Sequence, residues 1–304
     1  MPWKEALIKL CNELGCEALL DEPMSRHSSF AIGGPADVFV SPSSEQQIAI
    51  LIEYLRTGGI DYCILGKGSN ILVCDCGIRG VVIHIGKNLS GITREGNELI
   101  CMAGTPLTEL CKYALNEGLS GLEFAYGIPG SSGGAAYMNA GAYDGEMKDV
   151  LLSCRHIDQN GNIGMFEGEQ LALSYRSSAY SNDEYCITAL RLRLTPAPKS
   201  QIKQRMQELW ERRCTKQPLE FPSAGSTFKR PANGYASALI EQCGLKGRSV
   251  GGAMVSTKHS GFVINTGGAT CDDVLALIKV IKDEVMQKTG IALECEVRLF
   301  RCEN

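Results

Sequence analysis

Long apolar runs and clusters of like charge are both missing from this sequence of 304 residues. No apolar run approaches the ~18 residues that a membrane-spanning helix needs. The first residues, MPWKEALIKLCNEL, alternate charged and apolar side chains at helical spacing, so they resemble neither a signal peptide nor a membrane anchor. The net charge is −4, and no long basic run is present. We therefore expect a cytoplasmic protein that binds neither a membrane nor nucleic acid.

Motifs that hold metals are also missing. The sequence has no C-x-x-C pair and no HExxH motif, and its four histidines are scattered. Most of the fourteen cysteines lie in apolar segments, as Cys63, Cys101 and Cys186 do. This usage is typical of cysteine as a small hydrophobe in a reducing compartment. We expect no metal site, and neither an Fe–S cluster nor a disulfide framework is favoured, although Cys74 and Cys76 are close in sequence.

A dinucleotide fingerprint of the Rossmann type is missing as well. A strand is expected at residues 61–65, and the loop that follows it is GKGSN, residues 66–70. The third glycine of G-x-G-x-x-G would fall at Ile71, and the ILVC that begins there is typical of a strand rather than a helix. A Rossmann site for NAD is therefore not expected. The loop can still be a glycine turn between two strands whose N–H groups bind a phosphate.

The mixed order of expected helices and strands indicates an α+β fold. The chain length suggests two domains and also allows three. Pro196 and Pro198 mark the expected boundary between an N-terminal region, residues 1–195, and a C-terminal domain, residues 200–304. Helices are expected at residues 4–15, 44–57, 105–117, 199–217, 235–243 and 272–288. Strands are expected at residues 37–41, 61–65, 80–86, 98–103, 151–158, 163–166, 185–195, 249–255, 261–265 and 291–300.

Three of these expectations depend on particular side chains. Ser43 or Ser44 should cap the helix at 44–57. Thr105 should cap the next helix, with proline at its first position and a glycine beyond its end. The segment YCITALRLRLT, residues 185–195, alternates as a half-exposed strand does, with both arginines on one face.

The most unusual stretch is residues 126–143, YGIPGSSGGAAYMNAGAY. It holds five glycines, four alanines and two serines, and no charge. Small residues let the backbone approach a partner closely. Free N–H groups on a surface of low charge favour a bulky anionic ligand such as a nucleotide diphosphate. A tight turn packed against a helix is the alternative interpretation.

Three polar clusters could carry chemistry. The first, SYRSS at 174–178, includes an arginine whose guanidinium fork suits a carboxylate or a phosphate. The second, SAGSTFKRP at 223–231, combines serines, a glycine and cations without the nucleophile elbow of a hydrolase. The third, LECEVR at 293–298, would place two glutamates and an arginine on one face of a strand. An ordinary surface arginine, a helix-capping serine and a solvated charged stripe stay open as alternatives.

Five of these motifs, taken in order, resemble the UDP-N-acetylenolpyruvoylglucosamine reductase family of peptidoglycan synthesis. They are GKGSN at 66–70, IPGSSGGAAYMNAGAY at 128–143, SYRSS at 174–178, AGSTFKRP at 224–231 and LECEVR at 293–298. The resemblance spans essentially the whole chain and indicates the shorter subclass, which lacks an extra substrate-covering loop. It implies an FAD-binding region of the vanillyl-alcohol-oxidase (PCMH-like) type in two subdomains, about residues 20–80 and 81–195. A C-terminal substrate-binding domain follows.

The resemblance also implies tightly bound, non-covalent FAD, with NADPH as co-substrate. The positions expected to contact FAD are Gly66, Lys67, Gly68, Ser69, Asn70, Ile128, Pro129, Gly130, Ser131, Gly133, Gly134, Ala135, Asn139 and Gly141.

The implied reaction has two halves. NADPH reduces FAD, and hydride then passes from the flavin to the vinyl carbon of the enolpyruvyl ether of UDP-N-acetylglucosamine, giving UDP-N-acetylmuramate. By the same resemblance, Arg176 binds the substrate carboxylate and stabilises the enolate, and Ser226 supplies the proton. Glu296 would polarise or orient that carboxylate. Tyr175 and Lys229 would contact the substrate.

Two places depart from the family pattern. Ser131-Ser132 stands where threonine or isoleucine followed by valine is expected, and Arg230 stands where asparagine is common. The second departure leaves one substrate contact open. Two other interpretations also stay open, namely an FAD oxidase that uses O₂ and a non-catalytic sensor of nucleotide sugars with a structural flavin. We expect a monomer.

Overall fold

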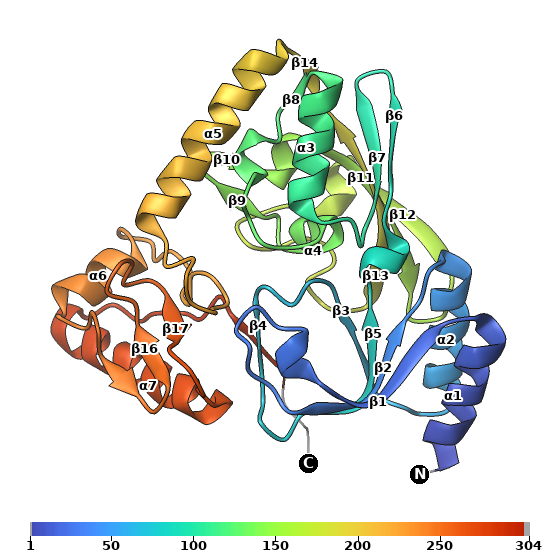
Figure 1. Cartoon of the computed structure of the whole chain (residues 1–304), viewed down its shortest axis with the longest axis horizontal. Coiled ribbons are helices and arrows are strands. Elements are labelled where there is room, and N and C mark those ends of the chain that lie inside the picture. The colour runs from blue at the N-terminus through green and yellow to red at the C-terminus, as the bar shows by residue number, and fades with distance from the viewer. Residues whose placement is uncertain (1, 301–304) are drawn as a thin grey trace. The chain divides into compact units, whose positions relative to one another are not determined.

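The computed structural model describes residues 2–300. These residues form two compact units (Figure 1). Unit 1 consists of residues 2–20, 38–67 and 80–212, and unit 2 consists of residues 21–37, 68–79 and 213–300. This division differs from the linear boundary expected near residue 195, because two N-terminal segments belong with the C-terminal residues.

Two amphipathic helices of unit 1 follow the sequence prediction closely. They are α1 (Pro2–Leu14) and α2 (Glu45–Thr57). The Ser44 hydroxyl caps α2 by accepting a hydrogen bond from the amide of Gln47 at 3.2 Å, and Gly58 ends the helix. Its apolar face is buried and consists of Ile48, Leu51, Ile52 and Leu55.

A four-stranded sheet has the order β1-β2-β5-β3. Its strands are β1 (Glu17–Pro23), β2 (Pro35–Ser41), β5 (Ile78–His84) and β3 (Tyr62–Leu65). Strands β3 and β5 are parallel, with Tyr62 opposite Val81. The sequence did not predict β1, because EALLDEP lacks alternation and leaves Leu20 53% exposed.

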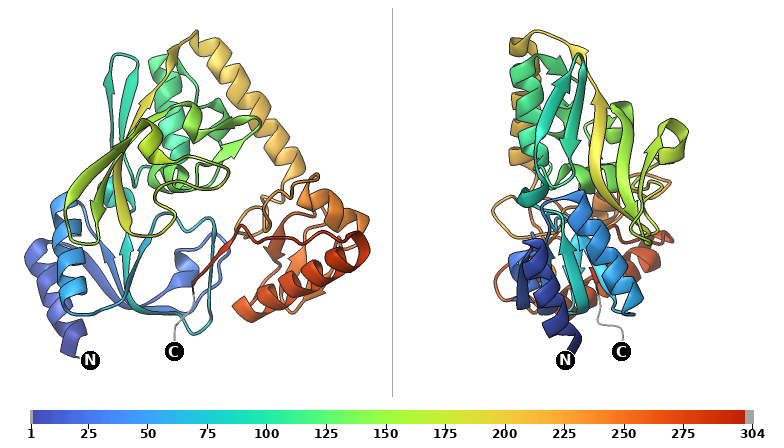
Figure 2. Two further views of the ribbon diagram at one scale, coloured as in Figure 1. Left: turned by 180° about the vertical axis from the view of Figure 1, so that it is seen from behind. Right: turned by 90° about the vertical axis from the view of Figure 1, so that its right-hand side faces the viewer.

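The five-stranded sheet of unit 1 is antiparallel and has the order β12-β11-β13-β7-β6. Its strands are β12 (Ile163–Glu167), β11 (Leu151–Asp158), β13 (Tyr185–Arg193), β7 (Glu98–Met102) and β6 (Ile92–Glu95). The expectation that β13 is half-exposed is wrong for its first half, because residues 186–190 are all buried in the centre of the sheet. Helices α3 (Leu107–Glu117) and α4 (Ser132–Tyr137) lie on the sheet (Figure 2).

The arginines of β13 do share one face, as predicted. Arg191 Nε donates to Glu98 Oε2 at 2.5 Å, and Arg193 Nη2 donates to Glu98 Oε1 at 2.8 Å. The two guanidinium groups hold the pKa of the Glu98 carboxyl below its usual value. Because the two arginine side chains are 42% and 66% exposed, solvent screens both pairs, and they contribute little to stability.

The start of α3 differs from the prediction. The residue before its first turn is Pro106, and no side chain caps the helix. Thr105 Oγ1 instead accepts a hydrogen bond from the amide of Gly91 at 3.0 Å. The predicted end is confirmed, since Gly118 has φ +67° there.

The remaining elements of unit 1 complete it around one apolar core. Helix α5 (Lys199–Lys216) buries Ile202, Met206 and Leu209, whereas Trp210 on the same helix is 40% exposed. Two short strand pairs are β14 (Thr195–Pro196) with β8 (Leu119–Ser120), and β10 (Gly145–Glu146) with β9 (Gly141–Ala142).

Unit 2 has its own apolar core, to which Phe30, Ile32 and Leu72 belong beside the C-terminal residues. Its helices are α6 (Ala236–Gln242) and α7 (Cys271–Thr289). A three-stranded sheet consists of β15 (Ser249–Val250), β16 (Ala253–Val255) and β17 (Val263–Asn265). Strand β4 (Ile71–Val73) pairs in parallel with β18 (Arg298–Phe300).

The last predicted strand is much shorter than expected. Residues 291–297 are irregular, and only Arg298–Phe300 forms a strand. The expectation that Glu294, Glu296 and Arg298 share one strand face is therefore wrong. Only Cys295 within 291–297 makes an isolated bridge, opposite Phe228.

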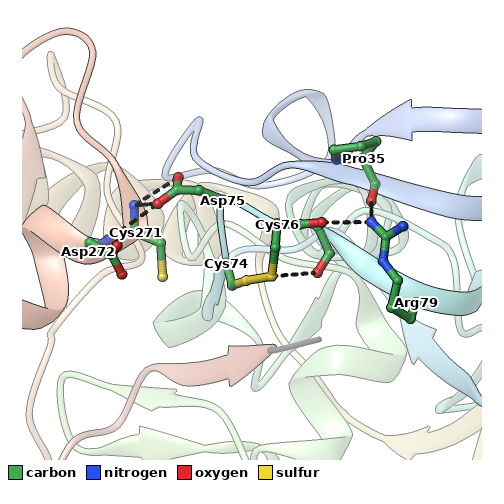
Figure 3. Close-up of a disulfide and its surroundings, with 8 residues drawn as sticks. Pro35, Cys74, Asp75, Cys76, Arg79, Cys271 and Asp272 are labelled. Atoms are coloured by element: carbon green, nitrogen blue, oxygen red, sulfur yellow. Dashed lines mark hydrogen bonds between the residues drawn. A yellow bond between two sulfur atoms is a disulfide. The ribbon is translucent and has the colours of Figure 1, made fainter. Parts of the chain in front are cut away.

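Cys74 and Cys76 form a disulfide with Asp75 between them (Figure 3). This pair corrects the expectation that no disulfide is favoured. The Asp75 carboxylate accepts hydrogen bonds at the start of α7, from the amide of Cys271 at 2.9 Å and from that of Asp272 at 3.4 Å. Eleven cysteines of the described part of the chain are free, and eight of these are buried, so the prediction of cysteine as a small hydrophobe is confirmed for them.

Within residues 2–300, no helix is both long and apolar enough to cross a membrane. The same residues hold no group of three or more His, Cys, Asp or Glu placed to bind a metal ion.

Candidate functional site

The GKGSN loop contains two glycines with close neighbours, and at Gly68 only glycine fits. A Cβ on Gly68, which has φ +64°, would lie 1.9 Å from the carbonyl oxygen of His27. A Cβ on Gly66 would lie 2.6 Å from Ser131 Oγ. Within unit 1, the start of this loop therefore lies against the glycine-rich stretch, as expected if both contact one ligand.

The glycine-rich stretch contains the short helix α4, so it is more than a loop. Ser131 is the residue before this helix, and its hydroxyl accepts from the amide of Gly134 at 3.3 Å. The fully buried Ser132 donates its hydroxyl to the carbonyl of Met102 at 2.8 Å. Both serines that depart from the family pattern thus have partners within the protein.

Backbone contacts fix the stretch to the segment before α3. The amide of Leu107 donates to the carbonyl of Gly130 at 3.0 Å, and that of Gly133 donates to the carbonyl of Ala103 at 2.9 Å. A Cβ on Gly133 would lie 2.7 Å from the Cβ of Ala103. The small residues here are therefore needed for close packing as well as for any ligand.

The composition of these loops fits a bound FAD. Residues 66–67 and 128–141 contain no carboxylate and one cation, Lys67, which is exposed. No fixed negative charge of the loops would repel a diphosphate. The positions expected to hold FAD from unit 1 are Gly66, Lys67, Ile128, Pro129, Gly130, Ser131, Gly133, Gly134, Ala135, Asn139 and Gly141.

Arg176 lies with Tyr175 in a tight turn of unit 1. Ser174 and Ser177 exchange backbone hydrogen bonds across this turn, at 3.0 and 3.2 Å. Arg176 has φ +55°, a left-handed conformation that costs a non-glycine residue about 1–3 kcal/mol. Its Nη2 donates to the carbonyl of Gly141 at 3.3 Å. The predicted catalytic arginine thus adjoins a predicted cofactor position.

In unit 2, the segment of Ser226 runs antiparallel to the segment of Glu296. The amide of Lys229 donates to the carbonyl of Glu294 at 2.8 Å, and that of Glu296 donates to the carbonyl of Thr227 at 2.9 Å. Ser226 is exposed and no helix begins there, which excludes the helix-cap alternative. Ser226 and Glu296 therefore lie on neighbouring segments, one residue out of register.

Asn70 connects the GKGSN loop to the Glu296 segment within unit 2. Its Nδ2 donates to the carbonyl of Glu296 at 3.1 Å, and its own carbonyl accepts from the amide of Arg298 at 3.0 Å. The first pair is 226 positions apart in sequence, so no local pattern could have revealed it.

Two cations of unit 2 have partners within the protein. Lys229 forms an ion pair with Glu294. The guanidinium carbon of Arg230 lies 4.2 Å from the centroid of the Tyr235 ring, which is a cation–π contact. Arg230 thus contacts an exposed aromatic ring at the position left open by the sequence.

The predicted site residues gather in two groups, one in each unit. Contacts in unit 1 connect Gly66 with Ser131, and Gly141 with Arg176. Contacts in unit 2 connect Asn70 and Thr227 with Glu296. The sequence missed Thr227, which accepts the Glu296 amide through its backbone and so carries no side-chain signal.

Comparisons with known proteins identify both regions. The FAD binding domain family matches residues 36–165, and the C-terminal domain of UDP-N-acetylenolpyruvoylglucosamine reductase matches residues 217–300. A reductase of this name from Clostridium botulinum (strain Hall) is 50% identical over 286 residues, which are 94% of this chain and 93% of that protein. One from Syntrophomonas wolfei is 49% identical over 280 residues, covering 92% and 94%.

A solved structure agrees with these matches. The crystal structure of the reductase from Thermus caldophilus superposes with a TM-score of 0.77 at 34% identity, covering 94% of this chain and 98% of that one.

Proposed function

The chain belongs to the UDP-N-acetylenolpyruvoylglucosamine reductase family, and we propose that it reduces the enolpyruvyl ether of UDP-N-acetylglucosamine to UDP-N-acetylmuramate. It is an FAD-dependent oxidoreductase of peptidoglycan synthesis, as the five motifs predicted. The predicted α+β fold class, an FAD-binding region followed by the reductase C-terminal domain, is confirmed.

We propose NADPH as the reductant and tightly bound, non-covalent FAD as the carrier that passes hydride to the substrate. The loops at residues 66–70 and 128–141 would hold FAD with backbone amides and small side chains. Their lack of carboxylates and their packing against each other at Gly66 and Ser131 support this assignment.

Each matched side chain has a proposed task toward the substrate. Arg176 would bind the carboxylate bidentately and stabilise the negative charge that develops as the vinyl carbon accepts hydride. Glu296 would orient the same carboxylate, and Ser226 would donate the proton to the resulting enolate. Tyr175 and Lys229 would contact the rest of the substrate, with Lys229 near its diphosphate.

The backbone pairing of Thr227 with Glu296 is the observation that carries this proposal. It places the proposed acid, Ser226, and the proposed orienting carboxylate, Glu296, on adjacent segments. A serine hydroxyl is a weak acid, so it can protonate only a strongly basic carbanion or enolate and only when it is held in place. An alcohol oxidase would need no acid at this position.

Substitution of Ser226 by alanine tests the proposal in the purified flavoprotein. Reduction of FAD by NADPH should continue at the wild-type rate, whereas reoxidation by the enolpyruvyl substrate should slow by about 10²–10⁴-fold, the usual contribution of a general acid. Anaerobic stopped-flow measurement at the flavin absorbance band separates the two halves.

Ser223→Ala in the same loop is the matched control, and it should leave both rates unchanged. A Ser226→Ala enzyme that reoxidises as fast as wild type would remove Ser226 from the acid role. Wild-type enzyme that NADPH bleaches but that only air recolours would favour the oxidase, and the reductase proposal would fall.

A further inference from the structure

The side-chain amide of Asn139, near the Arg176 turn, makes three hydrogen bonds within the protein. The residue follows α4, is fully buried and has φ +40°. Its Nδ2 donates to Glu146 Oε2 at 2.7 Å and to the carbonyl of Ser174 at 2.9 Å, while its Oδ1 accepts from the amide of Lys148 at 2.9 Å. Both amide hydrogens and the amide oxygen are thus engaged by protein groups.

The Ser174 contact controls the turn that carries Arg176. The carbonyl of Ser174 accepts from both Asn139 Nδ2 and the amide of Ser177, which closes the turn. On the other side of the turn, the Ser178 hydroxyl donates to the carbonyl of Tyr137 at 2.7 Å. The end of α4 therefore holds the Arg176 turn at both of its ends.

The other contacts of Asn139 link it to the strand pair that the Arg176 guanidinium contacts. Glu146 lies on β10, which pairs with β9, where Gly141 lies opposite Glu146. The carbonyl of Gly141 accepts the hydrogen bond from Arg176 Nη2 at 3.3 Å. The Asn139 side chain thus fixes both the backbone before Arg176 and the strand pair that the Arg176 guanidinium contacts.

The backbone conformation of Asn139 and Arg176 indicates why the Arg176 turn needs these contacts. Asn139 and Arg176, which are not glycines, adopt left-handed conformations beside these contacts. Such a conformation persists only where surrounding contacts over-determine it, which is typical of functional sites. A buried hydrogen-bonded amide supplies such contacts. Tyr143 and Asp144 also have positive φ, as the two central residues of the β9–β10 hairpin turn require.

We propose that Asn139 is a positioning residue for Arg176 and not a side-chain ligand of FAD. The inference rests on the proposed function, in which Arg176 binds the substrate carboxylate. Asn139 acts only through the geometry of the 174–177 turn. Its loss therefore affects the half-reaction that uses the substrate and spares the half-reaction that uses NADPH.

Substitution of Asn139 by aspartate tests this inference with nearly unchanged shape. The carboxylate faces the Glu146 carboxylate and the Ser174 carbonyl, neither of which it can donate to. We expect FAD content and the rate of NADPH reduction to stay within about twofold of wild type. Reoxidation by the enolpyruvyl substrate should slow by about 10²-fold, the effect of a small misplacement of a catalytic group.

The matched control is Asn265→Asp in unit 2. Asn265 is also a buried asparagine with three such contacts, to the carbonyl of Phe30 at 3.2 Å and from the amides of Gly267 and Ala269 at 2.9 and 3.1 Å. It should lower thermal stability without separating the two half-reactions. If Asn139→Asp slows both halves equally, or slows neither, the inference is wrong.

Two double variants separate positioning from stability. In Asn139→Asp/Glu146→Gln, the new amide at position 146 can donate to the carboxylate at position 139, so the melting temperature should recover. The second half-reaction should stay slow in this variant, because the Ser174 carbonyl has lost the donor at position 139 and keeps only the Ser177 amide. In an Arg176→Ala background, Asn139→Asp should slow that half-reaction by less than about twofold further. Fully multiplicative losses would show that Asn139 acts independently of Arg176.

The outcomes also distinguish this inference from the proposed function. Wild-type enzyme that does not reduce the enolpyruvyl substrate contradicts the function itself, whatever the variants do. Wild-type enzyme that does so, beside an Asn139→Asp enzyme of equal rate, contradicts only the role of Asn139. If Asn139→Asp does not fold, Asn139→Ser removes the reach to Ser174 without adding a charge, and the same rates are then measured.

Discussion

His156 lies in an aromatic cluster of unit 1, where its side chain is 4% exposed. The ring centroids of Phe166 and Tyr185 lie 4.4 and 4.7 Å from its own, and its Nδ1 lies 3.1 Å from Tyr180 Oη. Burial lowers the pKa of His156, and the charge of Asp158 opposes this shift without cancelling it. The folded protein therefore disfavours a protonated imidazole at this position.

Replacing His156 with phenylalanine should reduce the loss of stability in mild acid. Because the folded pKa is lowered, the stabilisation from the neutral ring is complete above the ordinary pKa of about 6.5 and is lost as pH falls below it. One proton can contribute a slope of at most about 1.4 kcal/mol per pH unit. Urea unfolding of both proteins at about pH 7.5 and about pH 5.5 measures the difference in slope.

His259 provides an internal reference for this comparison. Burial lowers its pKa too, but it is present in both proteins, so its contribution cancels in the difference. A difference in unfolding free energy that does not vary with pH would assign the acid sensitivity to other groups.

Single residues also show where sequence-based prediction reaches its limit. The small residues at 128–141, with Asn139 among them, were predicted to contact FAD from their composition and from the family resemblance. The particular task of Asn139 depends on Ser174, which is 35 positions away, and on a buried environment that only the folded chain creates. An asparagine amide suits a ligand or a backbone carbonyl equally well, so its chemistry could not decide between them.

At the scale of elements, helices were predicted well because periodic apolar residues and capping residues are local signals. Ser44 and Gly118 do what their types favour at helix ends. Alternation of polar and apolar residues predicted strands less well than these signals predicted helices. LECEVR alternates, yet residues 293–297 are irregular, because they meet another irregular segment, 227–229, through only a few backbone contacts. Pairing partners, which decide a strand, are not encoded locally.

Helix α7 offers an element-scale prediction at its N-terminus. Thr270 and Asp273 form a capping box, and Asp75 accepts from the amides of Cys271 and Asp272. Asp75→Ala removes an acceptor from this helix end, and we expect a loss of about 0.5–2 kcal/mol in the free energy of unfolding. Urea denaturation followed by circular dichroism measures it.

The control for Asp75 is Asp283→Ala on the same helix. Asp283 is exposed and pairs with Lys279 one turn away at 2.6 Å, so its loss should cost no more than about 0.5 kcal/mol. Equal losses for the two variants would contradict a capping role for Asp75. Asp75→Asn, which keeps an acceptor oxygen and removes the charge, should fall between them.

At the scale of the whole molecule, the division into units was the feature least accessible to prediction. The sequence suggested a boundary at the prolines near residue 196, which are local signals. The core of unit 2, however, includes Phe30, Ile32 and Leu72, more than a hundred positions before Arg213, where its last segment begins. Such long-range burial leaves no periodic trace in the sequence near either partner.

A fragment that begins at Arg213 should therefore not fold alone. It lacks three core side chains worth ~1.5–3 kcal/mol each when buried, a sum comparable with the whole stability of a typical domain. It also lacks β4, the only partner of β18 among the described strands. Far-UV circular dichroism during heating should show no cooperative transition for the fragment and a cooperative one for the full chain. A sharp transition in the fragment would contradict this account.

The segmented make-up of unit 2 also bears on how the chain is made in the cell. A ribosome releases residues 21–37 and 68–79 early, but their partners begin at residue 213. At ~5–20 residues per second, the wait between these segments lasts roughly 7–30 s. During that time Phe30, Ile32 and Leu72 have no core to enter, and unpaired apolar side chains invite aggregation and chaperone binding. Residues 21–37 and 68–79 of the nascent chain are thus exposed to aggregation until the residues from Arg213 onward have been synthesised.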